Sequence, residues 1–175
     1  MSVLLVGATG GLGRSVALRL VAQGDEVRVV EPDPRAVAAW RALGVHVARG
    51  EPDDEDLLFR AAQNARTIVL LDGPGRRLGA VTAAVVRAAA LVPVGRIVVC
   101  APVVPAEALE VLRSSGLEYV ALSTGRRLLG RGGTPDEVVA EAVDAADDLS
   151  GALRLELDLT EPEAYRVLKI PPRDR

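Results

Sequence analysis

The chain has 175 residues, of which 49% are hydrophobic and 26% are charged, and its formal net charge is −3. This size and composition predict one soluble domain with a single hydrophobic core. Aromatic residues make up only 2% of the chain, which excludes the stacking surfaces that bind single-stranded nucleic acid. The mild acidity excludes a broad basic surface for DNA or RNA.

Cysteine, histidine and lysine each occur once in the chain, as Cys100, His46 and Lys169. One cysteine cannot form a disulfide within the chain, and one cysteine with one histidine is too few for a zinc site, so we expect no bound metal. No stretch reaches the 18 or so apolar residues of a membrane span. The chain opens directly on an apolar run and a glycine loop rather than on a leader. We therefore expect a cytoplasmic protein that binds neither membranes nor nucleic acid.

Short apolar runs alternate with helical repeats along the whole chain. The runs typical of buried strands cover residues 3–6, 27–30, 45–48, 67–71, 96–100, 118–122 and 153–159. Helical spacing and end signals predict helices over residues 12–24, 34–43, 53–64, 78–91, 106–115 and 134–148, the last capped by Thr134 with Pro135 at its first position. The alternation predicts a Rossmann-like α/β fold, with a doubly wound, mostly parallel sheet and helices on both faces. We assign residues 1–160 to this single domain and residues 161–175 to a C-terminal tail.

A glycine pattern joins the first predicted strand to the first helix. Gly7, Gly10 and Gly13 have the spacing G-x-x-G-x-x-G. Such glycines permit a tight turn, a close approach of the backbone to a pyrophosphate, and close packing of the helix on the strand. The helix N-terminus then offers free N–H groups to the phosphates. The predicted phosphate-binding residues are Gly7, Thr9, Gly10, Gly11, Leu12 and Gly13; the alternative is a degenerate loop that keeps its shape without binding.

Glu31 ends the second predicted strand, where a carboxylate can accept hydrogen bonds from both hydroxyls of an adenosine ribose. The same carboxylate would repel a 2′-phosphate, so the sequence favours NAD(H) over NADP(H) as cofactor. Arg14 and Arg35 are near enough in sequence to serve a 2′-phosphate instead. The structural alternative for Glu31 is an exposed acid before a proline turn.

Four segments resemble the NmrA-like group of the atypical short-chain dehydrogenase/reductases. They are Leu5–Arg14 (LVGATGGLGR), Gly44–Glu51 (GVHVARGE), Ser115–Leu122 (SGLEYVAL) and Thr134–Val139 (TPDEVV). The resemblance spans about residues 2–160 and implies an NAD(P)-binding protein of that superfamily. It also implies that the cofactor passes the segment after the fourth strand, which adds Asp72 and Gly73 to the candidate site.

The catalytic pair of that superfamily is missing from its usual place. Active members carry Tyr-x-x-x-Lys after the fifth strand, but residues 101–110 contain neither tyrosine nor lysine. Tyr165 and Lys169 have the required spacing near the C-terminus, either as a displaced pair or as a segment that packs Tyr165 against the sheet. Ser123-Thr124-Gly125 also replaces the family's usual Arg-Pro-Gly. No catalytic residue is therefore assigned.

Residues 30–35 and 44–51 carry a second resemblance, to the nucleotide-binding regulatory domains of potassium transport systems. Those domains have an acid at the end of the second strand and sense NAD(H) or adenine nucleotides. Their first loop is usually Gly-x-Gly-x-x-Gly, so the loop that begins at Gly7 favours the reductase-like family.

Two arginines, the cysteine and the tryptophan have plain structural interpretations, and the arginines also have a functional one. Arg126 and Arg127 lie in a glycine-rich loop, where they either bind an anionic small molecule or are solvated surface arginines. Cys100 is interpreted as a small buried hydrophobe, and Trp40 as a packing residue on a helix face.

Three functions fit these observations. The first is an NAD(P)-dependent oxidoreductase acting on a small molecule. The second is a non-catalytic dinucleotide sensor, and the third is a redox-neutral cyclase or isomerase that reuses the fold. The sequence does not determine the oligomeric state and is compatible with a homo-oligomer.

Overall fold

The computed structural model describes residues 2–71, 77–125, 134–151 and 153–171. The strands in these ranges are β1 (Ser2–Val6), β2 (Glu26–Glu31), β3 (His46–Arg49), β4 (Ala65–Leu71), β5 (Arg96–Ala101), β6 (Tyr119–Ser123) and β7 (Arg154–Asp158). They form one sheet in the order β3-β2-β1-β4-β5-β6-β7, and every neighbouring pair is parallel. The predicted fold class is confirmed.

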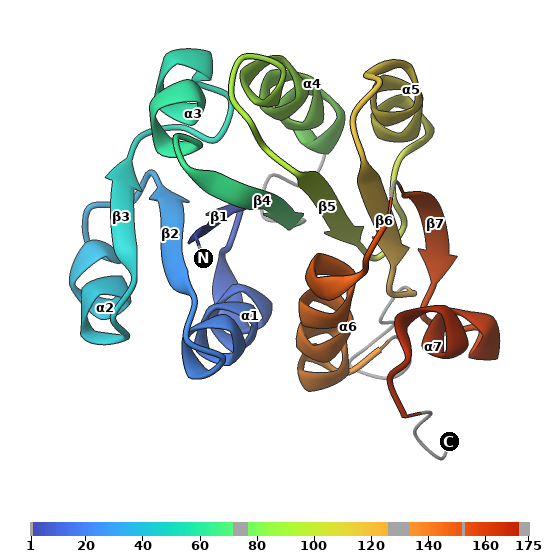
Figure 1. Cartoon of the computed structure of the whole chain (residues 1–175). Coiled ribbons are helices and arrows are strands. Elements are labelled where there is room, and N and C mark those ends of the chain that lie inside the picture. The colour runs from blue at the N-terminus through green and yellow to red at the C-terminus, as the bar shows by residue number, and fades with distance from the viewer. Residues whose placement is uncertain (1, 72–76, 126–133, 152, 172–175) are drawn as a thin grey trace.

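The helices in the described ranges divide between the two faces of the sheet (Figure 1). They are α1 (Gly10–Ala22), α2 (Val37–Ala42), α3 (Glu55–Ala61), α4 (Leu78–Ala89), α5 (Ala106–Ser114), α6 (Asp136–Asp148) and α7 (Pro162–Leu168). Residues of α1, α2, α6 and α7 pack on one face, and residues of α3, α4 and α5 pack on the other. Because both faces are covered, β1 and β5 are buried at every position and consist almost wholly of apolar residues.

The edge strand β7 alternates between apolar and charged residues, and this pattern also follows from how many of its faces are covered. Leu155 and Leu157 turn toward the core, whereas Arg154, Glu156 and Asp158 are exposed. Only one of its faces is covered, so apolar and charged residues alternate along the strand.

The order of the strands and their register set the position of the candidate site. After β1 the chain continues to β2 on one side of the β1–β4 pair, and after β4 it continues to β5 on the other side. The two connections diverge, so a crevice opens at the carboxyl ends of β1 and β4. Val6 of β1 pairs with Val30 of β2, which places Gly7 beside Glu31. The glycine loop and the predicted ribose acid are therefore neighbours.

Two local expectations differ from the structure. The N-cap residue of α6 is Pro135 rather than Thr134, whose hydroxyl donates to the carbonyl of Thr124 at 2.9 Å. This bond fastens the start of α6 to the residue after β6 and leaves the hydroxyl proton engaged outside the helix. Helix α7 lies within the segment assigned to a tail, and its Ala164 and Leu168 belong to the core.

Among the residues that the structure describes, no helix has both the length and the apolar character needed to cross a membrane. In the same ranges, no group of three histidine, cysteine, aspartate or glutamate side chains is arranged to hold a metal ion.

Candidate functional site

The glycine loop turns sharply between β1 and α1. Gly7 and Gly10 have φ angles of 71° and 74°, in the left-handed region that glycine adopts without strain. The backbone N–H of Thr9 donates to the carbonyl of Gly7 at 2.8 Å and closes the turn. The Thr9 side chain makes no cap hydrogen bond to α1, and the first turn of that helix holds no acidic residue. The positive end of the helix dipole therefore lies at this loop without an acid of its own first turn beside it.

The glycines at positions 10 and 13 face different surroundings. A Cβ atom on Gly13 would lie 2.3 Å from the carbonyl oxygen of Ala8, so only glycine lets α1 pack this closely on the loop. A Cβ atom on Gly10 would meet no atom of the described residues within 4 Å. The backbone at Gly10 thus borders open space, as the approach of a phosphate requires. Gly11 faces Asp136 at the start of α6, with 3.1 Å between the position of its Cβ and Oδ2.

Glu31 is buried rather than exposed, with only 5% of its surface accessible. The backbone N–H of Asp33 donates to its Oε1 at 2.9 Å, and the indole N–H of Trp40 donates to its Oε2 at 2.9 Å. These two donors hold the carboxylate in one orientation at the end of β2.

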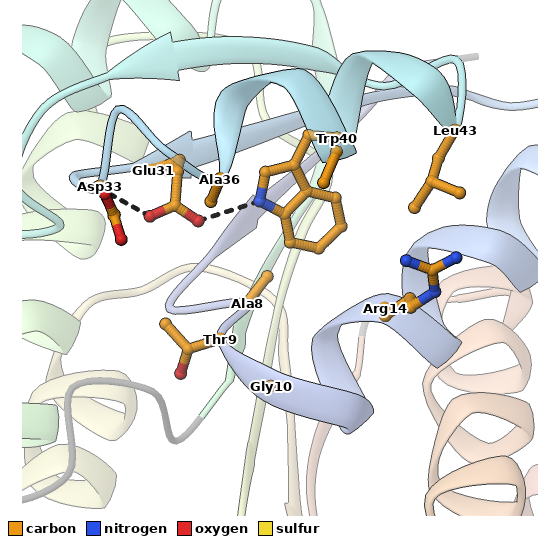
Figure 2. Close-up of a pocket in the computed structure, with 10 residues that line it drawn as sticks. Ala8, Thr9, Gly10, Arg14, Glu31, Asp33, Ala36, Trp40 and Leu43 are labelled. Carbon is orange, nitrogen blue, oxygen red and sulfur yellow. Dashed lines mark hydrogen bonds between the residues drawn. The ribbon is translucent and has the colours of Figure 1, made fainter.

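A cavity of about 320 Å³ joins the glycine loop to Glu31 (Figure 2). Its wall on the α2 side is mostly apolar, and its other side is formed by the loop and the start of α1. The lining residues are Ala8, Thr9, Gly10, Arg14, Glu31, Asp33, Ala36, Ala39, Trp40 and Leu43. A small apolar chamber with a few fixed polar groups is typical of sites for planar ligands.

The charges around this cavity are unevenly distributed. Asp33 pairs with Arg35, whose side chain is 89% exposed, and the hydrogen bond from that guanidinium lowers the pKa of Asp33. Arg14 reaches the cavity from α1 and is the one cation among the lining residues that the structure describes. Of the two arginines considered for a 2′-phosphate, Arg14 borders the cavity, whereas Arg35 is turned to solvent and bound to Asp33.

Several predicted residues lie outside the described ranges, namely Asp72, Gly73, Arg126 and Arg127. Arg77 lies within them and forms ion pairs with Asp53 and Glu51 from the loop after β3. Cys100 is fully buried in β5, in keeping with a packing residue.

Tyr165 and Lys169 sit apart from the glycine loop. The Tyr165 hydroxyl donates to the carbonyl of Leu159 at 3.0 Å. Lys169 ends α7 and lines a separate cavity of about 570 Å³ together with Leu149 and Leu153, which precede β7. All strands are parallel, so the amino end of β7 lies at one end of the strands and the loop that follows β1 lies at the other, carboxyl end.

The role of Trp40 as partner of Glu31 was not predicted from the sequence. The signal was present as a repeat of Ala36, Ala39, Trp40 and Leu43 at helical spacing, which forms the wall of the cavity. This repeat was interpreted only as packing, since a sequence does not show which helix face meets the end of a strand.

A protein-family comparison identifies the family of the chain. The model of the TrkA-N domain matches residues 3–123. The chain belongs to the TrkA-N domain family. The match supports an NAD(P)-binding Rossmann domain and does not by itself establish the specific NmrA-like group. No sequence among the curated proteins matches this TrkA-N domain chain.

Solved structures with the same fold come from reductases and an epimerase. The anaerobillin reductase ChuY from Escherichia coli O157:H7 has a TM-score of 0.77 and 18% identity, over 93% of this chain and 98% of its own. The triphenylmethane reductase of Citrobacter sp., complexed with NADP(H), has a TM-score of 0.73 and 17% identity, over 91% and 70%. A nucleoside-diphosphate-sugar epimerase from Staphylococcus aureus has a TM-score of 0.70 and 18% identity, over 90% and 71%. At these identities the likeness establishes the fold alone.

Proposed function

We propose that this TrkA-N domain binds NAD(H) between its glycine loop and Glu31 and acts as a compact, NmrA-like oxidoreductase on a small molecule. The observation that carries the proposal is the cavity in which an open backbone at Gly10 adjoins a buried carboxylate already fixed by two donors.

The residues present fit such a cofactor. The N–H groups at the start of α1, from Gly10 onward, would hold its phosphates, because the helix dipole favours anions there. Glu31 would accept hydrogen bonds from the adenosine ribose, and the apolar wall with Ala36 and Leu43 would cover the base. A bound nicotinamide supplies or accepts a hydride, while the protein contributes orientation and exclusion of water.

The preference for NAD(H) over NADP(H) is supported by charge. Glu31 and Asp33 place two carboxylates beside the cavity, and a 2′-phosphate there would face both of them. Arg14 is the opposing influence, and the Citrobacter relative is named as an NADP(H) complex. Because Asp33 is itself paired with Arg35, our proposal rests on the buried carboxylate of Glu31 outweighing Arg14.

A non-catalytic dinucleotide sensor is the second candidate. It is favoured by the segment after β5, where residues 101–110 hold no tyrosine or lysine, and by the hydrogen bond that engages the Tyr165 hydroxyl elsewhere. The third candidate, a redox-neutral cyclase or isomerase, has the same support from the missing pair.

Titration calorimetry with NAD⁺, NADH, NADP⁺ and NADPH tests the proposal. We expect NADH to bind more tightly than NADPH, and Glu31→Gln to weaken NADH binding about tenfold. Glu26→Gln is the matched control, since Glu26 is exposed at the other end of β2 and should leave binding unchanged. Absence of dinucleotide binding, or a clear preference for NADPH, contradicts the proposal.

A screen for cofactor oxidation with small carbonyl compounds then separates the candidates. Turnover supports the oxidoreductase, and tight binding without cofactor oxidation supports the sensor or the redox-neutral enzyme. An anionic substrate near Arg126 and Arg127, a homo-oligomer and a cytoplasmic location remain predictions from sequence.

A further inference from the structure

Trp40 and Glu31 form a buried pair within the cavity. They are 7% and 5% exposed, and the indole N–H of Trp40 points at Oε2 of Glu31 (Figure 2). With the Asp33 backbone N–H on Oε1, each carboxylate oxygen has one donor from the protein. A buried group bonded on both oxygens has little freedom to rotate.

The carboxylate of Glu31 can still accept further hydrogen bonds. A carboxylate offers about four lone-pair positions, two on each oxygen. One position on each oxygen is used here, so one on each remains for the two hydroxyls of a ribose. A 2′-phosphate supplies no hydroxyl at that position and adds negative charge instead.

Trp40 therefore combines two roles that can be separated by substitution. Its ring belongs to the apolar wall together with Ala36 and Leu43, and its N–H belongs to Glu31. Phenylalanine would keep most of the wall and remove only the donor. Without that donor only the backbone N–H of Asp33 holds the carboxylate, which can then rotate about that single bond and away from the ribose.

We propose that Trp40 is a positioning residue whose indole N–H holds Glu31 toward the adenosine ribose, and that this hydrogen bond sets the preference for a free 2′,3′-diol over a 2′-phosphate. The inference rests on the proposed function. It makes cofactor choice depend on α2 as well as on the end of β2.

The test compares NADH and NADPH binding to the full chain by titration calorimetry. In Trp40→Phe we expect the affinity for NADH to fall about tenfold and the affinity for NADPH to change less than about twofold. The ratio of the two dissociation constants should therefore move toward one. Leu43→Val is the matched control, because Leu43 lines the same wall without touching Glu31 and should affect both ligands alike. In a Glu31→Ala background, Trp40→Phe should no longer change the ratio.

Equal losses for both ligands in Trp40→Phe would mean that Trp40 serves only as wall, and would overturn the inference while leaving the proposed function standing. A wild-type chain that binds neither dinucleotide removes both.

A second measurement needs no variant. Trp40 is the only tryptophan, so its emission reports directly on the cavity. AMP should alter that emission, and adenosine 2′,5′-bisphosphate should require at least about tenfold higher concentration to do so. Equal concentrations for the two nucleotides contradict the inference.

Discussion

At the residue scale, the glycines of the loop serve different ends. Gly13 has the carbonyl of Ala8 against it, whereas Gly10 borders open space. The same residue type is thus required for packing at one position and for ligand approach at the other. The sequence pattern alone treats the two as equivalent.

We predict that Gly13→Ala and Gly10→Ala separate folding from binding. The methyl group of Gly13→Ala would meet backbone that has no room to move, so the free energy of unfolding should fall by about 3 kcal/mol. Gly10→Ala should lower it by only about 1–2 kcal/mol, the usual penalty of a left-handed φ, but should weaken dinucleotide binding at least tenfold. Urea unfolding and calorimetry measure the two effects.

Ser15→Ala, on the same helix, is the control for these variants and should change the free energy of unfolding by less than about 0.5 kcal/mol. A Gly10→Ala protein that binds NADH as tightly as wild type contradicts the assigned role of the loop.

At the scale of elements, an ion network ties together three parts of the fold that are distant in sequence. Arg66 on β4 donates to Asp25, in the turn before β2, with one N–O distance of 3.0 Å, and to Asp147 near the end of α6. Thr67 also donates to Asp147. The Asp25 and Asp147 side chains are 10% and 1% exposed, so these charges are stabilised mainly by each other.

This network predicts a specific loss of stability in acid. The hydrogen bond from Arg66 lowers the pKa of Asp25 below its ordinary value. A carboxylate with a lower pKa in the folded state than in the unfolded state stabilises fully above the unfolded pKa of about 4, and this stabilisation disappears as the pH falls through the folded value. We expect Asp25→Asn to lower the free energy of unfolding by about 2 kcal/mol at pH 7 and by progressively less below about pH 4.

Urea unfolding from pH 7 to pH 2.5 measures the difference between Asp25→Asn and wild type. Glu55→Gln is the control, because Glu55 pairs with Arg87 on the exposed surface and its loss should have little effect at any pH. A difference for Asp25→Asn that stays constant throughout the acid range contradicts the role given to Arg66.

At the scale of the whole molecule, the architecture was predictable because its strands are continuous apolar runs and its helices repeat at a clear period. Each predicted strand overlaps an observed one. Helix α7 was missed because Pro162–Leu168 is short and only Ala164 and Leu168 are fully buried in it, which is too weak a pattern to stand out. The hydroxyl of Thr134 was misassigned because its partner, Thr124, is ten residues away in sequence.

The candidate site was predictable only in part. The glycine spacing and the acid at the end of β2 are local signals, so Gly7 and Glu31 could be named from sequence. The bond between Trp40 and Glu31 joins a helix face to a strand end. Its existence depends on how α2 is docked, which the sequence does not state.

The core of the described chain suggests that the molecule unfolds as one unit. Trp40, at the β3 edge of the sheet, and Leu168, beside β7, belong to the same buried cluster on one face. We therefore predict that Leu168→Ala lowers the free energy of unfolding by about 3 kcal/mol, since it leaves a cavity in that cluster. The loss should be reported equally by Trp40 emission and by far-ultraviolet circular dichroism, because two-state unfolding makes distant probes coincide.

Arg166→Ala, exposed on the same helix, is the control and should change the midpoint of unfolding little. If Leu168→Ala shifts the dichroism but leaves the Trp40 transition in place, then α7 unfolds separately and residues 161–175 form an appendage to an independent domain.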